Sequence, residues 1–292
     1  MQIKPAQNSL QDFGSCRNVI QRIERLISLF SRPMFVLLSP AKTFRKVDTA
    51  PSVGGSQPIF LDDAERLVAG LSQLSAGDIA DLMGVNPEIA AVNFDRFQAW
   101  ERPFHPGNAV PAVLAFDGEV YRGLAAEKWA VQDHEYAQRH MRILSGLYGI
   151  LRPHDLIQRY RLEMGCKWSL NGTKGHLYGF WGDRIAEQIL DETDGPIVNL
   201  ASNEYIKPVL GTRVEERMTQ CHFKDLKDGE YKALMTYAKK SRGAMARFIV
   251  KNRIDRIEGM KDFNENGYTF RPDFSDDKQL TFTRDENPDN LK

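Results

Sequence analysis

The stretch Phe35-Val-Leu-Leu-Ser-Pro-Ala-Lys-Thr43 decides which fold to expect. Residues 35–38 are apolar and β-prone, and Ser39-Pro40 breaks the run at once. A short apolar run bounded by a turn signal is typical of a buried strand. Open α/β sheets place ligand contacts just past the carboxyl ends of such strands. The turn therefore predicts an anion or phosphate contact through Lys42. A plain turn with a solvated Lys42 is equally compatible with this sequence.

A second apolar run, Pro196-Ile-Val-Asn-Leu-Ala201, also ends in a polar turn, Ser202-Asn-Glu204. We expect another buried strand here, with Glu204 as a candidate acid or base and Tyr205 beside it. An Asx-type turn explains the same residues without any chemistry.

The spacing of apolar residues alternates between helical and extended along the rest of the chain. It predicts helices over 61–74, 77–83, 87–100, 133–144, 178–190 and 237–252, with Ser75 capping the second. It predicts strands at 112–116 and near 120–121, 222–223, 231–234, 267–270 and 280–283. This mixture predicts a mixed α/β (α+β) fold, a single domain with a central β-sheet flanked by helices.

Composition narrows the class of protein. The 292 residues carry 39 Lys+Arg against 39 Asp+Glu, 42% are hydrophobic and 27% are charged, which is ordinary for a soluble globular protein. No apolar run approaches the roughly 20 residues of a membrane span. Cys16, Cys166 and Cys221 lie far apart without a C-x-x-C pair, which argues against a disulfide framework and for a reducing, cytoplasmic setting.

Residues 1–33 form a separate segment in this interpretation. Arginines interleaved with apolar residues over 17–32 predict a basic amphipathic helix, which suits either a transit peptide or a loosely packed upstream extension. Asp12 and Glu24 interrupt the basic character and favour the extension, with Met34 as a natural start. We expect a domain over 34–284 and a tail over 285–292.

The segment from Arg139 to Pro153 predicts a helix that ends in a Gly-x-x-Gly turn, Gly146 and Gly149. Two helices joined by such a turn offer backbone N–H groups to a phosphate, as in the helix-hairpin-helix of nonspecific DNA binders. A plain helix C-cap is the alternative. Five basic residues face a single Asp155 between 139 and 161, which favours an anionic partner: Arg139, Arg142, Arg152, Arg159 and Arg161.

The stretch 158–165 alternates charged and apolar residues. Arg159, Arg161 and Glu163 are therefore candidates to line a cleft, or else they are paired charges on a surface strand.

The stretch 237–253 has six basic and no acidic residues. At 100° per residue Lys240, Arg247 and Lys251 fall within about 40° of one another, while Ala238, Met245 and Ile249 share the opposite side. We expect a helix that buries one face and offers a cationic stripe to an anion; a solvated charged face is the alternative.

Several motifs are absent from the sequence. It contains no H-E-x-x-H, G-x-S-x-G, G-x-G-x-x-G or Walker A loop, and its six histidines share no ligand spacing. Neither a metal site nor a cofactor is predicted.

Seven stretches together resemble the YaaA family of bacterial peroxide-stress proteins. They run in family order and begin at Leu37, Ala115, Arg142, Tyr160, Phe180, Asn199 and Tyr237, as in Arg142-Ile-Leu-Ser-Gly-Leu-Tyr-Gly-Ile-Leu-Arg-Pro153. The resemblance implies a single-domain mixed α/β fold with a helix-hairpin-helix beside a positively charged cleft, DNA binding, and a role in lowering free iron during peroxide stress. The residues that match family positions are Lys42, Arg142, Gly146, Gly149, Arg159, Arg161, Lys239, Lys240 and Arg242. The chain departs from the family in residues 1–33 and in Asn203, where an Asp is common.

Two functions follow as hypotheses. The first is a DNA-binding stress protein without turnover that contacts phosphates through the matching residues together with Arg152, Arg247 and Lys251. The second is an enzyme acting on a nucleotide or nucleobase, or a site for a small anionic ligand, at the strand ends; its candidates are Lys42, Arg161, Glu163, Asn199 and Glu204. Direct iron sequestration is the weakest hypothesis, because no carboxylate or histidine cluster has ligand spacing.

Overall fold

A strand near the start of the described chain lies inside the main sheet. The structure is a computed structural model that describes residues 33–46, 54–168, 170 and 175–286. Its eight-stranded sheet has the order β11-β12-β9-β8-β1-β5-β6, and β10 pairs with β9. β1 (Phe35–Leu38), all four residues of which are buried, runs parallel to both β5 (Met141–Ser145) and β8 (Ile197–Asn199). The expected buried strands at 35–38 and 197–199 are therefore confirmed.

The sheet continues outward on both sides of these three strands. β9 (Met218–Lys227) is parallel to β8 and to β12 (Gln279–Arg284). Antiparallel partners close the edges: β6 (Gly149–Leu151), β10 (Glu230–Lys232) and β11 (Thr269–Phe270). The sheet is thus central and mostly parallel, as a mixed α/β fold requires.

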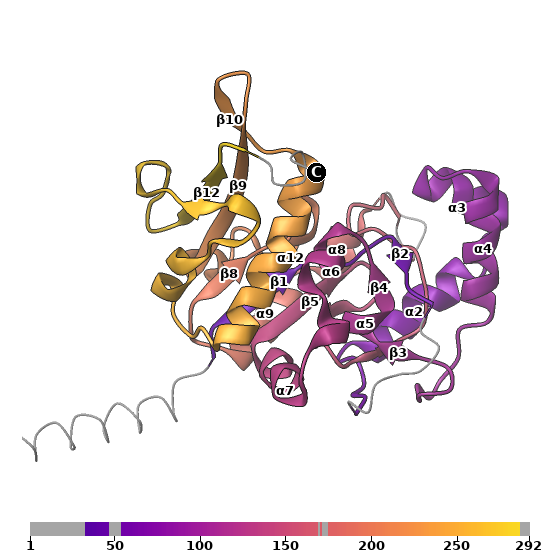
Figure 1. The fold of residues 1–292 in the computed structure, drawn as a ribbon. Coiled ribbons are helices and arrows are strands. Elements are labelled where there is room, and N and C mark those ends of the chain that lie inside the picture. The colour runs from indigo at the N-terminus through magenta and orange to yellow at the C-terminus, as the bar shows by residue number, and fades with distance from the viewer. Residues whose placement is uncertain (1–32, 47–53, 169, 171–174, 287–292) are drawn as a thin grey trace, which may run out of the picture.

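Helices flank this sheet. The bounds of the longer ones are α2 (Leu61–Leu71), α3 (Ala76–Met83), α4 (Pro87–Gln98), α7 (Val131–His140), α9 (Arg184–Glu192) and α12 (Met235–Asn252). Short ones are α5 (Ala112–Ala115), α6 (Glu119–Leu124), α8 (Leu177–Trp181), α10 (Asn203–Ile206) and α11 (Arg213–Glu216). In Figure 1, α3 and α4 lie on the opposite side of the molecule from β9 and β12. In the part of the chain that the structure describes, every helix is too short or too polar to span a bilayer.

The helix expected over 133–144 is wrong over its last four residues. α7 ends at His140, and Met141 to Ser145 form a strand that is buried throughout. Ile143 and Leu144 pair with Leu151 and Ile150 of β6, and Leu38 pairs with Ile143 on the other side. Hydrogen bonds on both edges and complete burial favour the extended form over a surface helix.

Two other local predictions were also wrong. The expected strand over 112–116 is the single helical turn α5, with only Phe116 and Asp117 extended as β4, and 120–121 lies within α6. The expected helix over 178–190 is two helices, because Gly182 adopts φ 49° and ψ −133° between α8 and α9. The expected amphipathic helix in the first 33 residues lies outside the described part of the chain.

Two glycines let α6 and α12 approach each other closely. A Cβ atom placed on Gly243 would lie 1.8 Å from the Val120 carbonyl oxygen, and one on Gly123 would lie 2.0 Å from the Lys240 carbonyl oxygen. Any side chain at either position would push the helices apart. Ala238, Met245 and Ile249 are buried in the core, which confirms the predicted apolar face of α12.

Candidate nucleic-acid interface

The turns after β1 and β8 meet at the carboxyl edge of the sheet. The Ser39 hydroxyl accepts a hydrogen bond from the Ser202 backbone N–H at 2.9 Å and donates to the Ser202 hydroxyl at 3.3 Å. The Tyr121 hydroxyl donates to the Ser39 carbonyl at 3.0 Å. Parallel strands bring their carboxyl ends to one edge, and these bonds fix the two polar turns against each other.

Glu163 joins two of the predicted cationic residues. One of its carboxylate oxygens lies 3.0 Å from the Lys42 ammonium and 3.1 Å from Nε of Arg161. Glu163 is largely shielded, with 14% of its side chain exposed, whereas Lys42 is 62% exposed. The structure therefore brings Lys42, Arg161 and Glu163 together, and Lys42 stays accessible to an anion.

Glu204 lies at the same edge, but its carboxylate holds the backbone of a neighbouring segment in place. Its carboxylate accepts the Gly165 N–H at 3.0 Å, and its carbonyl accepts the Tyr178 hydroxyl at 3.1 Å. Burial raises the pKa of Tyr178, and the negative charge of Glu204 raises it further. Asn199 is buried and bonds Gln220 and the Ala201 N–H, so it supports the turn from inside the sheet.

A pair of arginines stands next to this cluster. Arg159 is exposed and donates to the Arg45 carbonyl at 2.9 Å, while Arg96 of α4 lies over the Phe44 ring at 5.8 Å. Burial lowers the pKa of Arg96, and the nearby positive charge of Arg159 lowers it further. Within the described residues neither guanidinium forms an ion pair with a carboxylate. Two adjacent unneutralised arginines are a favourable place for a phosphate.

Arg96 was not among the residues predicted from the sequence. Its neighbours Phe44 and Arg159 come from distant parts of the chain, so no local pattern marks it. The helix prediction for 87–100 placed Arg96 near a helix end, but only the tertiary structure turns it toward the segment 159–163.

The helices α3 and α4 form a helix-turn-helix unit beside the arginine pair. The Ser75 hydroxyl caps α3, Gly84 ends it in the left-handed conformation at φ 58°, and the Asn86 side chain caps α4 through the Ile89 N–H. The Cys166 thiol lies 3.8 Å from the Leu82 carbonyl of α3, so the unit packs against the segment that carries Arg159 and Arg161.

The glycine turn expected at Gly146 and Gly149 joins two strands rather than two helices. Ser145 pairs with Gly149 in an antiparallel hairpin of β5 and β6. A Cβ on Gly146 would lie 2.2 Å from the Leu162 carbonyl oxygen, and Gly149 has φ 68° with Trp181 against it. The helix-glycine-helix arrangement predicted at this place is therefore wrong. Both glycines are required by the close packing of their neighbours.

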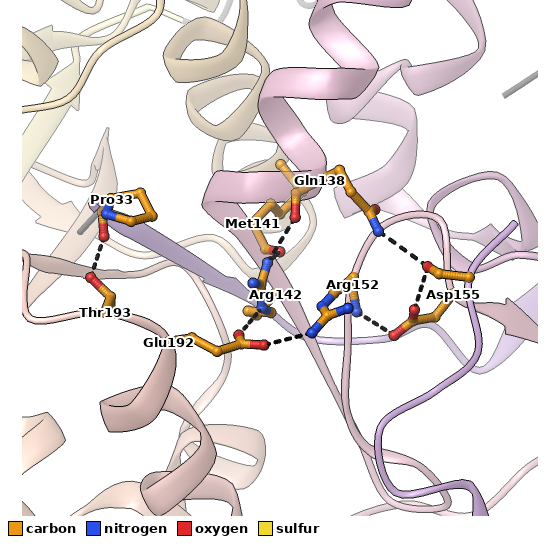
Figure 2. Close-up of polar contacts among 9 residues, drawn as sticks. Pro33, Gln138, Met141, Arg142, Arg152, Asp155, Glu192 and Thr193 are labelled. Atoms are coloured by element: carbon orange, nitrogen blue, oxygen red, sulfur yellow. Dashed lines mark hydrogen bonds and ion pairs between the residues drawn. The ribbon is translucent and has the colours of Figure 1, made fainter. Parts of the chain in front are cut away.

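Arg142 and Arg152 lie in a polar network at the other end of β5. Figure 2 shows both guanidiniums converging on Glu192, at 2.6 Å for Arg142 and 3.0 Å for Arg152. Arg142 also donates to the carbonyls of Gln138 and Met141 and is 5% exposed. The positive charge of Arg142 is therefore paired inside the protein and is not exposed to solvent.

The basic residues of α12 have varied surroundings. Lys239 is exposed, and Lys240 and Arg242 are half-buried. Arg247 bonds the Gly123 carbonyl and Glu265, and Lys251 pairs with Asp133 at 2.5 Å. A phosphate contact by this stripe remains a prediction, in which DNA would compete with these carboxylates.

Comparison of the sequence with known proteins shows which family the chain belongs to. The family model described as "Peroxide stress protein YaaA" matches residues 34–274. A protein of Dechloromonas aromatica named "UPF0246 protein" is 47% identical over 258 residues, which cover 87% of this chain and 100% of the relative. A protein of the same name from Saccharophagus degradans is 44% identical over 255 residues, covering 86% of this chain and 99% of the relative. The chain therefore belongs to the YaaA family of peroxide stress proteins.

Proposed function

We propose that this protein binds DNA without sequence preference, through the phosphate backbone, at the basic surface formed by Lys42, Arg96, Arg159 and Arg161. The observation that carries the proposal is that Arg96 and Arg159 contact the adjacent residues Phe44 and Arg45, and that neither forms an ion pair with a carboxylate of the described residues. The residues on either side link this pair to Lys42, because Arg159 bonds Arg45 while Arg161 and Lys42 share Glu163. Phosphate contacts of this kind carry no base information.

The α3 and α4 unit fits the same proposal. Arg96 lies in the last turn of α4, so this helix positions it at the basic surface. The two carboxylates at the strand ends act as partners in this arrangement: Glu163 positions Lys42 and Arg161, and Glu204 holds Gly165. This assignment favours binding over turnover.

Binding of labelled duplexes of two unrelated sequences across a salt series tests the proposal. The double variant Arg96→Gln and Arg159→Gln should weaken both duplexes equally and lower the slope of log K against log salt by about 1.8, or roughly 0.9 for each phosphate that is no longer neutralised. Arg256→Gln is the matched control, because the Arg256 side chain is 82% exposed and, among the described residues, its ion pair is with Asp255 at 3.6 Å. An unchanged slope in the folded double variant would overturn the proposal.

The family description motivates a cellular role. We infer that the protein acts in the cytoplasm during peroxide stress and limits free intracellular iron, which protects DNA and protein from oxidation. Electron paramagnetic resonance of chelated iron in whole cells tests this role. Cells without the protein should hold more free iron after peroxide exposure, and equal levels would contradict it.

A further inference from the structure

A separate pocket has a lining that includes none of the four residues of the basic surface. Its volume is about 830 Å³, within the range of small-ligand sites. Its lining residues come from α10, α11, β9, the start of β12 and the residues next to them, and β9 and β12 are labelled in Figure 1. Its polar lining includes Asn203, Glu216, Gln220, His222 and Gln279, and Met218 adds an apolar surface.

The alternation of β9 aims these side chains at the pocket. Cys221 and Phe223 are buried on the core face, so Gln220 and His222 point to the other face. Cys221 and Phe223 would suffice to hold the strand in the core. On the opposite face His222 forms a side-chain hydrogen bond with Gln279, so Gln220 is the residue of the pair that can serve a ligand.

Hydrogen bonds within the sheet fix the direction of the Gln220 amide. The Asn199 Oδ1 accepts the Ala201 N–H at 2.8 Å, so the Asn199 Nδ2 must donate to the Gln220 Oε1, at 2.8 Å. The Gln220 Nε2 is then the outward atom of the amide. It has no acceptor among the described residues and is an oriented donor at the pocket.

The pocket holds charged groups of both signs. Glu215 and Glu216 both line it, whereas one ammonium, that of Lys278, does so and is bound to the Glu216 carbonyl. Burial lowers the pKa of His222, and the charges of Lys224 and Arg242 lower it further, so its imidazole is neutral at pH 7. The Glu216 carboxylate forms no ion pair with any described residue and is available as an acceptor.

We propose that this pocket binds an uncharged nucleobase with an exocyclic amino group, as a nucleoside of adenine or cytosine. Gln220 would donate to a ring nitrogen or carbonyl, and Glu216 would accept from the amino group. Amides and carboxylates are the side chains that recognise these base edges in proteins.

Titration of the full chain with adenosine, cytidine and uridine, followed by calorimetry or ligand-observed NMR, tests the proposal. Adenosine and cytidine should bind at least about fivefold more tightly than uridine, because uracil has no amino group to meet Glu216. Equal affinity for uridine, or no nucleoside binding up to about 5 mM, would overturn the proposal.

Two variants locate the ligand in the pocket. Gln220→Glu keeps the acceptor for Asn199 but replaces the outward donor with an oxygen, and it should weaken adenosine by about tenfold. Glu216→Gln replaces the charged acceptor with a weaker, neutral amide oxygen at an exposed position, and it should weaken adenosine binding by about fivefold even where Gln220→Glu fails to fold. The matched controls are Gln132→Glu and Glu135→Gln, both exposed on α7. Pocket variants that bind like their controls would overturn the proposal, and unchanged duplex binding by all four separates this pocket from the basic surface.

Discussion

Arg142 of β5 and Glu192 at the end of α9 form a buried ion pair, with Nε 2.6 Å from the carboxylate. The Arg142 guanidinium also lies 4.3 Å from the centre of the Phe35 ring in β1. The pair therefore connects two adjacent strands to a helix that covers the sheet (Figure 2). The sequence alone predicted that the positive charge of Arg142 would contact DNA, but in the structure this charge is paired with Glu192 inside the protein.

Replacing Arg142 by Met is expected to destabilise the fold by about 3 kcal/mol, because Glu192 loses its buried partner and keeps only Arg152. Urea unfolding measures the loss. Arg152→Gln, at a side chain that is 37% exposed, should cost about 1 kcal/mol or less. Duplex binding by the folded Arg142 variant should match that of the parent. A stable variant with weakened DNA binding would return Arg142 to the DNA-binding surface.

Gly243→Ala should destabilise the protein by about 3 kcal/mol, since the new methyl group would lie 1.8 Å from the Val120 carbonyl oxygen without movement of α6. Gly179→Ala in α8 is the control, because a Cβ there meets nothing within 4 Å and should stabilise the helix by up to about 1 kcal/mol. Thermal melts of the two variants decide the matter. Equal melting temperatures would show that the two helices can separate freely.

Acid should weaken the fold through two buried histidines. His134 Nδ1 and His154 Nε2 lie 3.1 Å apart, burial lowers the pKa of both, and that of His154 falls to about 4. Below pH 6.5 the unfolded chain gains protons that the folded chain does not, so stability falls as pH drops toward 4, by up to about 1.4 kcal/mol per pH unit for each histidine.

Urea unfolding at pH 7.5 and pH 5 measures this dependence. The variant His154→Gln should show a shallower loss, since one of the two titrating groups is gone. A parent protein with the same pH dependence as the variant would contradict the assignment of the acid sensitivity to this pair.

Replacing Lys240, Arg247 and Lys251 together by Gln tests whether the cationic stripe of α12 contacts phosphates. If the three residues contact phosphates, the salt slope of duplex binding should fall by roughly 0.9 for each phosphate released from its cation. Glu265 and Asp133 lose ion-pair partners in this variant, so a stability loss of about 1 kcal/mol is also expected. An unchanged slope in the folded protein would restrict DNA binding to the surface around Arg96 and Arg159.

The main strands could be predicted because their signal is local. Phe35 to Leu38 and Ile197 to Asn199 are apolar runs followed by polar turns, and both are buried strands. The strand Met141 to Ser145 could not be separated from the preceding helix, because its residues also fit a helical face. Its conformation depends on hydrogen bonds to β1 and β6, which the sequence does not record.

For the candidate site too, features with a local sequence signal could be predicted, and features that depend on tertiary contacts could not. The convergence of Lys42, Arg161 and Glu163 was expected from residues placed at strand ends, and the structure joins them. Arg96 was missed and Arg142 was assigned to DNA, because local charge does not reveal burial or distant partners. A basic residue in a pattern shows only that a charge is present, and tertiary contacts decide whether that charge faces solvent.

The position of β1 has a consequence for synthesis on the ribosome. Val36 pairs with Met141 on one side and with Val198 on the other, so an early apolar strand waits for partners that are translated much later. Until both arrive, its edges are unpaired and able to join another nascent chain. The sheet can close only after β8 has left the exit tunnel. Slow translation beyond β5 would lengthen this exposure, and a holding chaperone would have the segment around Phe35 as its natural target.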